Sequence, residues 1–220
     1  NGEHYSTLYA QRSMLNTTQR IKAIIPVHLY GMPANMDAIM GIANKYGIPI
    51  IEDAAEALGS KYLGKPAGTY GEMGILSFNG NKIITTSGGG SLISDSEEHI
   101  RKARFLATQA RDKAPHYQHS EIGYNYRMSN IVAGIGRGQM EVLSERVRAK
   151  RENYEFYRRN LAGIEGISFT DEPGPEYFSN RWLTTILIDP EITGTDREQV
   201  RLALEKENIE VSIIDANTFN

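Results

Sequence analysis

The sequence has 220 residues, of which 40% are hydrophobic and 23% are charged, and its formal net charge is -3. These proportions are typical of a globular protein of one domain, or slightly more, that can bury a sizeable core. The small negative charge does not favour binding to nucleic acid. The lack of cysteine excludes disulfides and thiolate catalysis. No apolar run approaches the roughly 18–20 residues of a membrane span, so we expect a cytoplasmic protein without a membrane partner.

Short apolar runs alternate with a helical pattern in the first part of the chain. The run at 23–29 predicts a strand, and 35–47 carries apolar residues on one helical face before a glycine stop. Further apolar runs predict strands at 48–51, 73–78 and 91–93. Because such strands are apolar on both faces, the pattern predicts an α/β fold whose sheet is covered on both sides.

Two helices are predicted in the middle of the chain. Ser94 and Glu97 are spaced as a capping box for a helix that runs to about Ala107. Apolar residues then recur at helical spacing over 130–161, which predicts one long helix. We expect a domain boundary within or just after this helix, around 150–165.

The last part of the chain predicts one strand and one helix. The apolar run at 182–188 is typical of a strand. Thr195 and Glu198 are spaced as a cap, so a helix is expected to begin there and to end near Asn208.

Two residues with useful chemistry follow predicted strands. Asp53 comes directly after the run at 48–51, and ligands gather at the carboxyl ends of strands in open α/β sheets. A helix cap or an ordinary ion pair would account for this carboxylate equally well. Lys82 emerges from a turn that Asn79 and Gly80 favour. Within a site, desolvation would lower the pKa of its amine and make it a nucleophile toward carbonyls, although most lysines after turns are solvated.

Four weaker signals have simpler interpretations. The glycine-rich segment 85–91 lets backbone approach a ligand, or it forms a flexible turn. The glycines of 134–138 resemble a dinucleotide fingerprint, but no strand precedes them, which favours helix packing. His116 and His119 have the spacing of metal ligands without a third, so no metal site is expected. The basic stretch 148–159 is interrupted by glutamates and is typical of a solvated helix face.

Six segments, in this order and at this spacing, resemble the DegT/DnrJ/StrS family of sugar aminotransferases that depend on pyridoxal phosphate (PLP). Each segment alone is a weak signal, whereas the ordered set is specific and runs through most of the chain. The branch it resembles most adds an amino group to C4 of a nucleotide-linked 4-keto-6-deoxy sugar. The segments are PVHLYG (26–31), IEDAAEALGS (51–60), SFNGNKIITTSGGG (77–90), KARFLATQAR (102–111), GYNYRMSN (123–130) and SNRWL (179–183).

The resemblance implies PLP fold type I, with a mainly parallel, three-layer α/β large domain and a smaller α+β domain. Residues 1–155 would be the remainder of the cofactor-binding large domain, and 156–220 would begin the small C-terminal domain. The family's opening segment, which contacts the cofactor, is expected to be absent. The end of the chain, 211–220, also departs from the Arg-Pro-Leu-Trp-like stretch that is usual in the family. The chain therefore looks like a fragment.

The resemblance also implies a role for each site residue. Lys82 would carry PLP as a Schiff base, and Asp53 would pair with the pyridine nitrogen of the cofactor. Ser77 would hydrogen-bond the cofactor phosphate, and Glu56 would lie near the ring hydroxyl, where many relatives have glutamine. Asn125 would reach the phosphate from the other subunit, so the active site would be shared within a homodimer.

The implied reaction is transamination in surface-glycan biosynthesis, with L-glutamate as the amino donor and a nucleotide sugar as the acceptor. Lys82, once released from the cofactor, would act as general base and acid. A UDP-linked N-acetylhexosamine is favoured over a GDP-linked substrate of the perosamine type. One alternative is a PLP-dependent sugar dehydratase, but those relatives have histidine at the position of Lys82. A cofactor-free binding remnant and, more distantly, an NAD-dependent dehydrogenase are the others.

Overall fold

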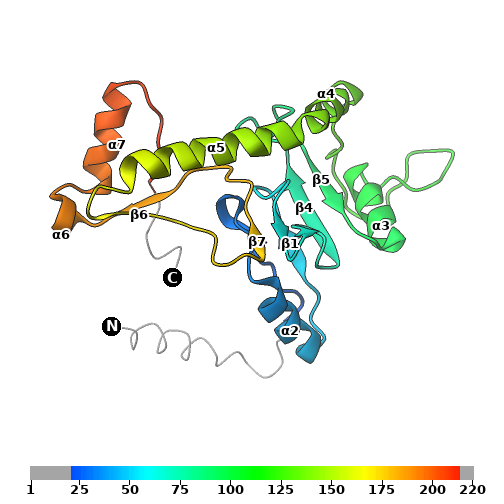
Figure 1. The fold of residues 1–220 in the computed structure, drawn as a ribbon. Coiled ribbons are helices and arrows are strands. Elements are labelled where there is room, and N and C mark those ends of the chain that lie inside the picture. The colour runs from blue at the N-terminus through cyan, green and yellow to red at the C-terminus, as the bar shows by residue number, and fades with distance from the viewer. Residues whose placement is uncertain (1–20, 214–220) are drawn as a thin grey trace.

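The computed structural model describes residues 21–213, and its strands gather in three small sheets beside one long helix, α5 (Figure 1). The helices are η1 (Leu29–Gly31, a 3-10 helix), α2 (Met36–Tyr46), α3 (Glu97–Ala107), α4 (Asn130–Glu141), α5 (Leu143–Leu161), α6 (Pro190–Thr193) and α7 (Arg197–Lys206). The strands are β1 (Ile51–Asp53), β2 (Lys61–Tyr62), β3 (Lys65–Pro66), β4 (Met73–Ser77), β5 (Gly90–Ile93), β6 (Ile167–Phe169), β7 (Tyr177–Phe178) and β8 (Ile186–Ile188).

The central sheet has the order β1-β4-β5 and positions the candidate site. Strand β1 pairs with β4 in parallel, with Asp53 opposite Ile75, whereas β4 pairs with β5 in the antiparallel sense, with Ser77 opposite Gly90. The predicted strand at 23–29 lies beside β1, where it forms isolated parallel bridges to it and to the residue before it. The arrangement is the predicted α/β class.

A second sheet joins segments that are far apart in the sequence. Strand β2 lies between β3 and β7 and pairs with both in the antiparallel sense. Lys61 and Tyr62 of β2 therefore face Phe178 and Tyr177 of β7, more than a hundred positions later in the chain. This pairing brings the residues that follow β7 toward the central sheet.

Helix α2 forms where the sequence predicts it. The side chain of Asn35 caps its first turn by accepting a hydrogen bond from Ala38 N at 3.1 Å. Gly47 ends it in the left-handed conformation, with φ at 60°, which a residue without a side chain adopts without strain. Met36 and Ala43 on its inner face are buried against Ile50, so the predicted apolar face is the one that packs.

The predicted caps of two helices are wrong by one or two positions. Helix α3 is capped by Ser96, which accepts a hydrogen bond from His99 N at 3.3 Å, whereas the predicted Ser94 donates to the carbonyl of Glu72. Ser94 is engaged with Glu72, and Ser96 is the hydroxyl that accepts from a free amide in the first turn of α3.

Helix α7 begins with a capping box of Asp196 and Gln199, not of Thr195 and Glu198 as predicted. Asp196 accepts from Gln199 N at 2.8 Å, and the Gln199 side chain accepts from Asp196 N at 2.9 Å. Asp and Gln at these positions satisfy the same spacing rule one residue later. The helix ends at Lys206, close to the predicted end.

The predicted single helix over 130–161 is divided at Val142. Helix α4 ends before it and α5 begins after it, and the two helices contact different segments. In α4, a Cβ added to Gly136 would lie 3.1 Å from Thr86, so that helix lies close to the glycine-rich segment. In α5, Val147 packs over Gly59, where an added Cβ would be 2.8 Å away.

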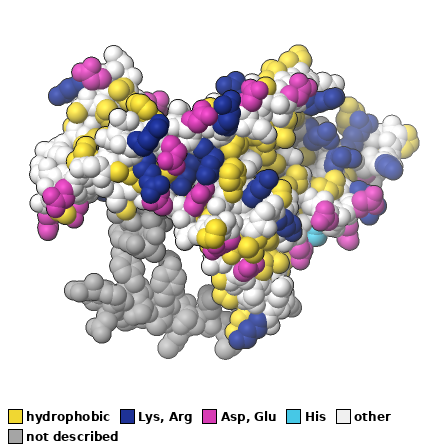
Figure 2. Space-filling model, viewed as in Figure 1, with side chains coloured by type: hydrophobic (Ala, Val, Ile, Leu, Met, Phe, Trp, Pro, Cys, Tyr) yellow, Lys and Arg dark blue, Asp and Glu magenta, His cyan; other side chains and the backbone are white. Residues whose placement is uncertain are grey.

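Helix α5 carries interleaved basic and acidic side chains on its exposed face (Figure 2). Arg148 and Glu152 form an ion pair of 3.2 Å one turn apart, with both side chains mostly exposed. This agrees with the predicted solvated helix face. On the opposite face of α5, Val147 and Tyr154 are buried.

Beyond α5, β6 and β8 form a two-stranded antiparallel sheet beside α6 and α7 (Figure 1). The assignment of 1–155 and 156–220 to two domains stays a prediction, and residues 1–20 and 214–220 lie outside the described part. The expected departure over 211–220 therefore falls mostly outside it. Among residues 21–213, no helix is long and apolar enough to cross a membrane, and the cytoplasmic location stays a prediction.

Candidate active site

The carboxyl ends of two neighbouring strands lie at the same edge of the central sheet. Strands β1 and β4 run parallel, and β1 ends at Asp53 while β4 ends at Ser77. Asp53 is in register with Ile75, only two residues before Ser77. The carboxylate and the hydroxyl therefore emerge at one edge, where ligands bind in sheets of this kind.

The main chain of Asp53 is fixed on both sides. Its N–H donates to Pro26 O at 2.9 Å, and its carbonyl accepts from His28 N at 3.0 Å. One carboxylate oxygen accepts a hydrogen bond from Ala55 N at 3.1 Å. The side chain is half-buried, so it is held in place and still reaches the edge of the sheet.

Lys82 follows β4 in a tight turn. Its N–H donates to Asn79 O at 3.1 Å. After the turn the chain comes back beside the end of β4, where Thr86 N donates to Phe78 O at 2.9 Å. The Lys82 side chain is only 13% exposed, and its Nζ lies 3.2 Å from Glu56 Oε1. Unlike most lysines that follow turns, Lys82 is therefore largely buried and faces a carboxylate.

Glu56 links Lys82 to the segment that follows the first apolar run. Its Oε1 accepts from Lys82 Nζ, and its Oε2 accepts from Tyr30 N at 2.7 Å. Tyr30 has a φ of 52° inside η1, which turns its amide toward this carboxylate. Burial raises the pKa of the Tyr30 hydroxyl above its ordinary value, and the negative charge of Glu56 adds to this.

Trp182 completes the surroundings of Lys82, and no role was predicted for it. Lys82 Nζ lies 4.2 Å from the centroid of the Trp182 ring, within the range of a cation–π contact. The indole N–H donates to Asn81 O at 2.7 Å, and Tyr30 stacks on the ring at 6.1 Å between centroids. The feature of the sequence that could have indicated a role is that Trp182 is the only tryptophan of the 220 residues and lies in the SNRWL segment.

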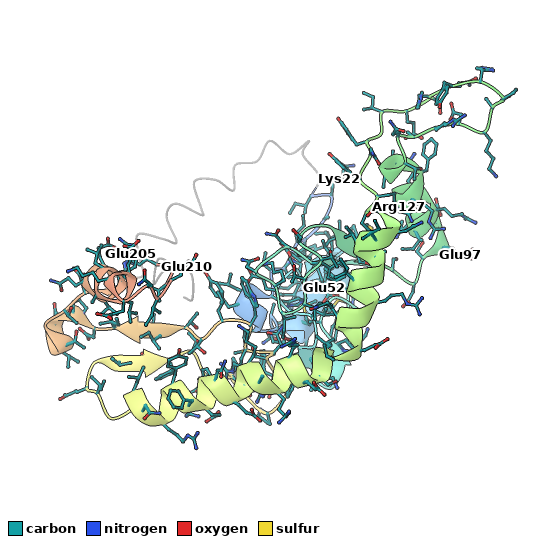
Figure 3. All side chains as sticks on the ribbon, turned by 90° about the horizontal axis from the view of Figure 1, so that it is seen from above. Lys22, Glu52, Glu97, Arg127, Glu205 and Glu210 are labelled. Atoms are coloured by element: carbon teal, nitrogen blue, oxygen red, sulfur yellow. The ribbon has the colours of Figure 1, made fainter. Side chains whose placement is uncertain are left out.

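A buried hydrogen-bonded pair lies beneath the site and was also missed. Glu52 and His28 are fully buried, and His28 Nε2 lies 2.9 Å from Glu52 Oε2 (Figure 3 labels Glu52). His28 Nδ1 accepts a hydrogen bond from Ala34 N at 3.0 Å, so the hydrogen of a neutral ring sits on Nε2 and is donated to Glu52. Glu52 also accepts from Gly68 N at 2.8 Å and Gly71 N at 2.7 Å.

The pKa of Glu52 is lower than its ordinary value. Burial alone would raise it, but hydrogen bonds from His28, Gly71 and Gly68 favour the charged carboxylate and outweigh burial. Because Glu52 and His28 flank Asp53 in the sheet, this pair fixes the backbone that presents the Asp53 carboxylate. The signal in the sequence was a carboxylate inside an apolar strand, where it needs partners.

Asn125 is the remaining predicted site residue. It is exposed, in the segment after α3, and forms an isolated antiparallel bridge with Thr108. The structure thus brings Asp53, Ser77 and Lys82, with Glu56, to one edge of the sheet, whereas Asn125 belongs to the segment between α3 and α4. An exposed position is compatible with a role in a partner subunit, and that role stays a prediction.

The two histidines and the glycines of 134–138, which gave weaker signals in the sequence, make local contacts. His116 contacts Gln118 at 3.2 Å, and His119 contacts the carbonyl of Gln109 at 2.8 Å. Within residues 21–213, no group of three or more His, Cys, Asp or Glu side chains could hold a metal ion. The glycines of 134–138 lie in α4, as the helix-packing interpretation predicts.

Comparison with known proteins identifies the family of this chain. The model of the DegT/DnrJ/EryC1/StrS aminotransferase family matches residues 11–218. The chain is 56% identical over 192 residues to "Putative pyridoxal phosphate-dependent aminotransferase EpsN" of Bacillus subtilis (strain 168), covering 86% of this chain and 48% of that protein. It is 36% identical over 192 residues to GDP-perosamine synthase of Vibrio cholerae, covering 87% and 52%.

A solved structure shares the fold. The crystal structure of DesI in the presence of its TDP-sugar product has a TM-score of 0.80 and 28% identity to this chain, covering 91% of it and 50% of DesI. The α/β class is therefore confirmed, together with the family of PLP fold type I sugar aminotransferases. The chain spans about half the length of the relatives that it matches.

Proposed function

This chain belongs to the DegT/DnrJ/EryC1/StrS aminotransferase family, and we propose that it carries the PLP-binding centre of a nucleotide-sugar aminotransferase. One observation carries the proposal. The amine of Lys82 is largely buried and lies 3.2 Å from Glu56, at the sheet edge where β1 delivers Asp53. An amine and an acid at one strand edge are what a pyridinium aldehyde cofactor requires.

The residues at this edge fit the cofactor by their chemistry. PLP has an aldehyde, a pyridine nitrogen, a ring hydroxyl and a phosphate. Lys82 would bind the aldehyde, Asp53 the protonated nitrogen, Glu56 would lie near the hydroxyl, and Ser77 would donate to the phosphate. When bound, PLP supplies an electron sink that stabilises the negative charge left when a C–H bond of the substrate is deprotonated.

The reaction itself depends on proton transfers by Lys82. Its amine, once released from the cofactor, would take a proton from Cα of the amino donor. It would then deliver this proton to the carbon of the cofactor that was the aldehyde carbon. Glu56, at 3.2 Å, would orient the amine and stabilise its charged form between these transfers. Asp53 would keep the cofactor nitrogen protonated throughout.

The proposed substrate is a nucleotide-linked 4-keto-6-deoxy sugar, which becomes the 4-amino sugar with L-glutamate as the donor. The 36% identity to a GDP-perosamine synthase supports this reaction class. Glutamate at position 56, where many relatives have glutamine, favours the 4-amino branch. A UDP-linked N-acetylhexosamine remains the preferred acceptor, and the product would enter surface-glycan synthesis.

The proposal includes a homodimer. Asn125 is exposed on the segment that follows α3, and it would enter the site of the partner subunit to bind the cofactor phosphate. Each active site would then take Lys82 from one subunit and Asn125 from the other.

A titration of the purified protein with PLP tests the proposal. We expect the visible absorbance band of lysine-bound PLP to appear, and the band to bleach on addition of L-glutamate. Lys82→Ala should remove the band while the circular dichroism of the fold is retained. If the wild-type protein binds no PLP, the cofactor-free binding remnant becomes the better interpretation.

UDP- and GDP-linked 4-keto-6-deoxy sugars, supplied in parallel to the glutamate-treated protein, then identify the acceptor. The expected result is return of the original band with the UDP-linked N-acetylhexosamine. Return of the band only with the GDP-linked sugar would reject the preferred nucleotide and keep the reaction class. Release of the 3-position oxygen of the sugar without amination would indicate a dehydratase.

A further inference from the structure

We propose that Trp182 is a positioning residue that holds the amine of Lys82 in line with Glu56. The inference rests on the proposed function, because the amine that Trp182 positions is the proposed catalytic one. It adds a residue from the C-terminal part of the chain, 101 positions from the turn that it contacts. Its consequence is that the segment 179–182 belongs to the active-site architecture.

The amine of Lys82 lies between two different surfaces. Glu56 Oε1 is 3.2 Å from Nζ, and the centroid of the Trp182 ring is 4.2 Å from it. A carboxylate attracts the amine by charge, and the face of an indole attracts a cation by its quadrupole. A free lysine side chain samples many rotamers, so two contacts on one amine restrict its direction.

The indole that makes this contact is itself fixed. Trp182 is 5% exposed, and its Nε1–H donates to Asn81 O at 2.7 Å. Tyr30 stacks on the ring with an interplanar angle of 14°. Trp182 therefore contacts both the main chain just before Lys82 and the Lys82 side chain, and it cannot rotate without losing the hydrogen bond.

Asn180 anchors the segment that carries Trp182. It is fully buried, and its side-chain amide donates to Glu56 O at 2.8 Å and to Leu58 O at 2.9 Å. Its main-chain N–H donates to Ser60 Oγ at 2.9 Å, and its Oδ1 accepts from Trp182 N at 2.8 Å. One side chain thus sets the backbone of Glu56 and that of Trp182, the two partners of the lysine.

The fit around Asn180 leaves no space for movement. A Cβ added to Gly31 would lie 1.9 Å from Asn180 Oδ1, and the carbonyl of Gly31 accepts from Ser60 Oγ at 2.6 Å. The next residue, Arg181, has a φ of 53° and donates to Thr170 O at 2.6 Å. The strained backbone is therefore held at both ends, as expected where a side chain must be presented in one direction.

Nuclear magnetic resonance of the cofactor-free protein tests the contact. Lysines labelled by reductive ¹³C-methylation keep their charge, and a methyl group over an indole face is shifted upfield by the ring current. The Lys82 resonance, assigned by its loss in Lys82→Arg, should lie upfield of exposed lysines such as Lys113. Trp182→Leu should move it to the exposed position, whereas Trp182→Phe, which keeps an aromatic face, should retain most of the shift.

Cofactor capture by unlabelled protein tests the role. Trp182→Leu should capture PLP about tenfold more slowly than wild type, as expected for loss of one cation–π contact at a shielded site. Trp182→Phe should restore most of the rate. Circular dichroism and thermal melting show whether each variant is folded, and the phenylalanine variant decides the question if the leucine variant is not.

Two outcomes overturn the inference. One is a Lys82 resonance at the position of exposed lysines in the wild-type protein, or one that Trp182 substitutions do not move. The other is PLP capture at the wild-type rate by a variant that has lost the upfield shift. If the wild-type protein captures no PLP, the proposed function fails, and the resonance comparison alone then decides whether Trp182 holds Lys82 in place.

Discussion

Lys82 and Glu56 are 26 positions apart in the sequence, and their side chains meet at 3.2 Å beside the carboxyl edge of β1 and β4. The other oxygen of the same carboxylate accepts the amide of Tyr30 at 2.7 Å. Three segments of the chain therefore converge on one carboxylate.

Removal of the Glu56 carboxylate should affect turnover more than stability. We expect Glu56→Ala to lower kcat about 10–100-fold, since it removes a charge-assisted hydrogen bond to the catalytic amine. Glu56→Gln keeps an oxygen for Tyr30 N and should lower kcat by less than about tenfold. Steady-state kinetics measures these losses, and Glu97→Ala, a substitution at an exposed position, serves as the control. Equal losses in the alanine and glutamine variants would show that only the charge matters.

The buried carboxylate of Glu52 should make stability depend on pH in the acid range. Its pKa in the folded state is lowered from 4.5, so its stabilisation is complete above that value and is lost as pH falls through the folded-state pKa. Urea unfolding between neutral pH and pH 3 (roughly the range in which carboxylates titrate) should show this loss.

Glu52→Gln should be destabilised by about 1–3 kcal/mol at neutral pH, because the Nε2–H of His28 and the backbone amides that bind Glu52 lose a charged acceptor. The variant should also show a flatter acid limb than wild type. A glutamine variant as stable as wild type would contradict the role given to the Glu52–His28 pair.

Two glycine substitutions with opposite expected signs test the packing around Asn180. Gly31→Ala places a methyl group 1.9 Å from Asn180 Oδ1 at a φ of 85°, so it should destabilise the protein and displace Trp182. Gly41→Ala lies in α2 with open space around it and should stabilise by about 0.5–1 kcal/mol. Urea unfolding, followed by the emission of Trp182, reports both effects. A neutral Gly31→Ala would show that the contact relaxes easily.

The shared active site can be tested by mixing two inactive variants. Lys82→Ala and Asn125→Ala subunits, unfolded and refolded together, should regain activity if Asn125 acts on the partner. In a mixed dimer one site then carries both substitutions and the other carries neither. No regain, with mixed dimers shown by mass spectrometry, would place Asn125 in its own subunit's site or outside the mechanism.

The elements that local patterns encode were predicted well. The apolar face of α2 and its Gly47 stop, and the strands that end near Asp53 and Ser77, follow from periodicity and turn chemistry. Asp53 and Lys82 each follow a strand predicted from the sequence, and the parallel pairing of β1 with β4 brings the ends of these strands to one edge. The family resemblance, confirmed by the comparisons, assigned residue types to roles that geometry alone leaves open.

What the sequence could not give depends on contacts between distant segments. The helices on either side of the break at Val142, α4 and α5, contact different segments, and helical spacing alone does not encode this break. The roles of Trp182 and Asn180 depend on the pairing of β2 with β7, which no local pattern predicts. The misplaced cap of α3 shows the same limit at short range, because Ser94 is engaged by Glu72 of a preceding segment.

Reductive trapping tests the central assignment most directly. The protein is incubated with PLP, reduced with borohydride to fix any imine, digested and mapped by mass spectrometry. The account predicts a pyridoxyl adduct on Lys82 at close to one per chain, and none in Lys82→Arg. An adduct on another lysine, with Lys82 unmodified, would contradict it.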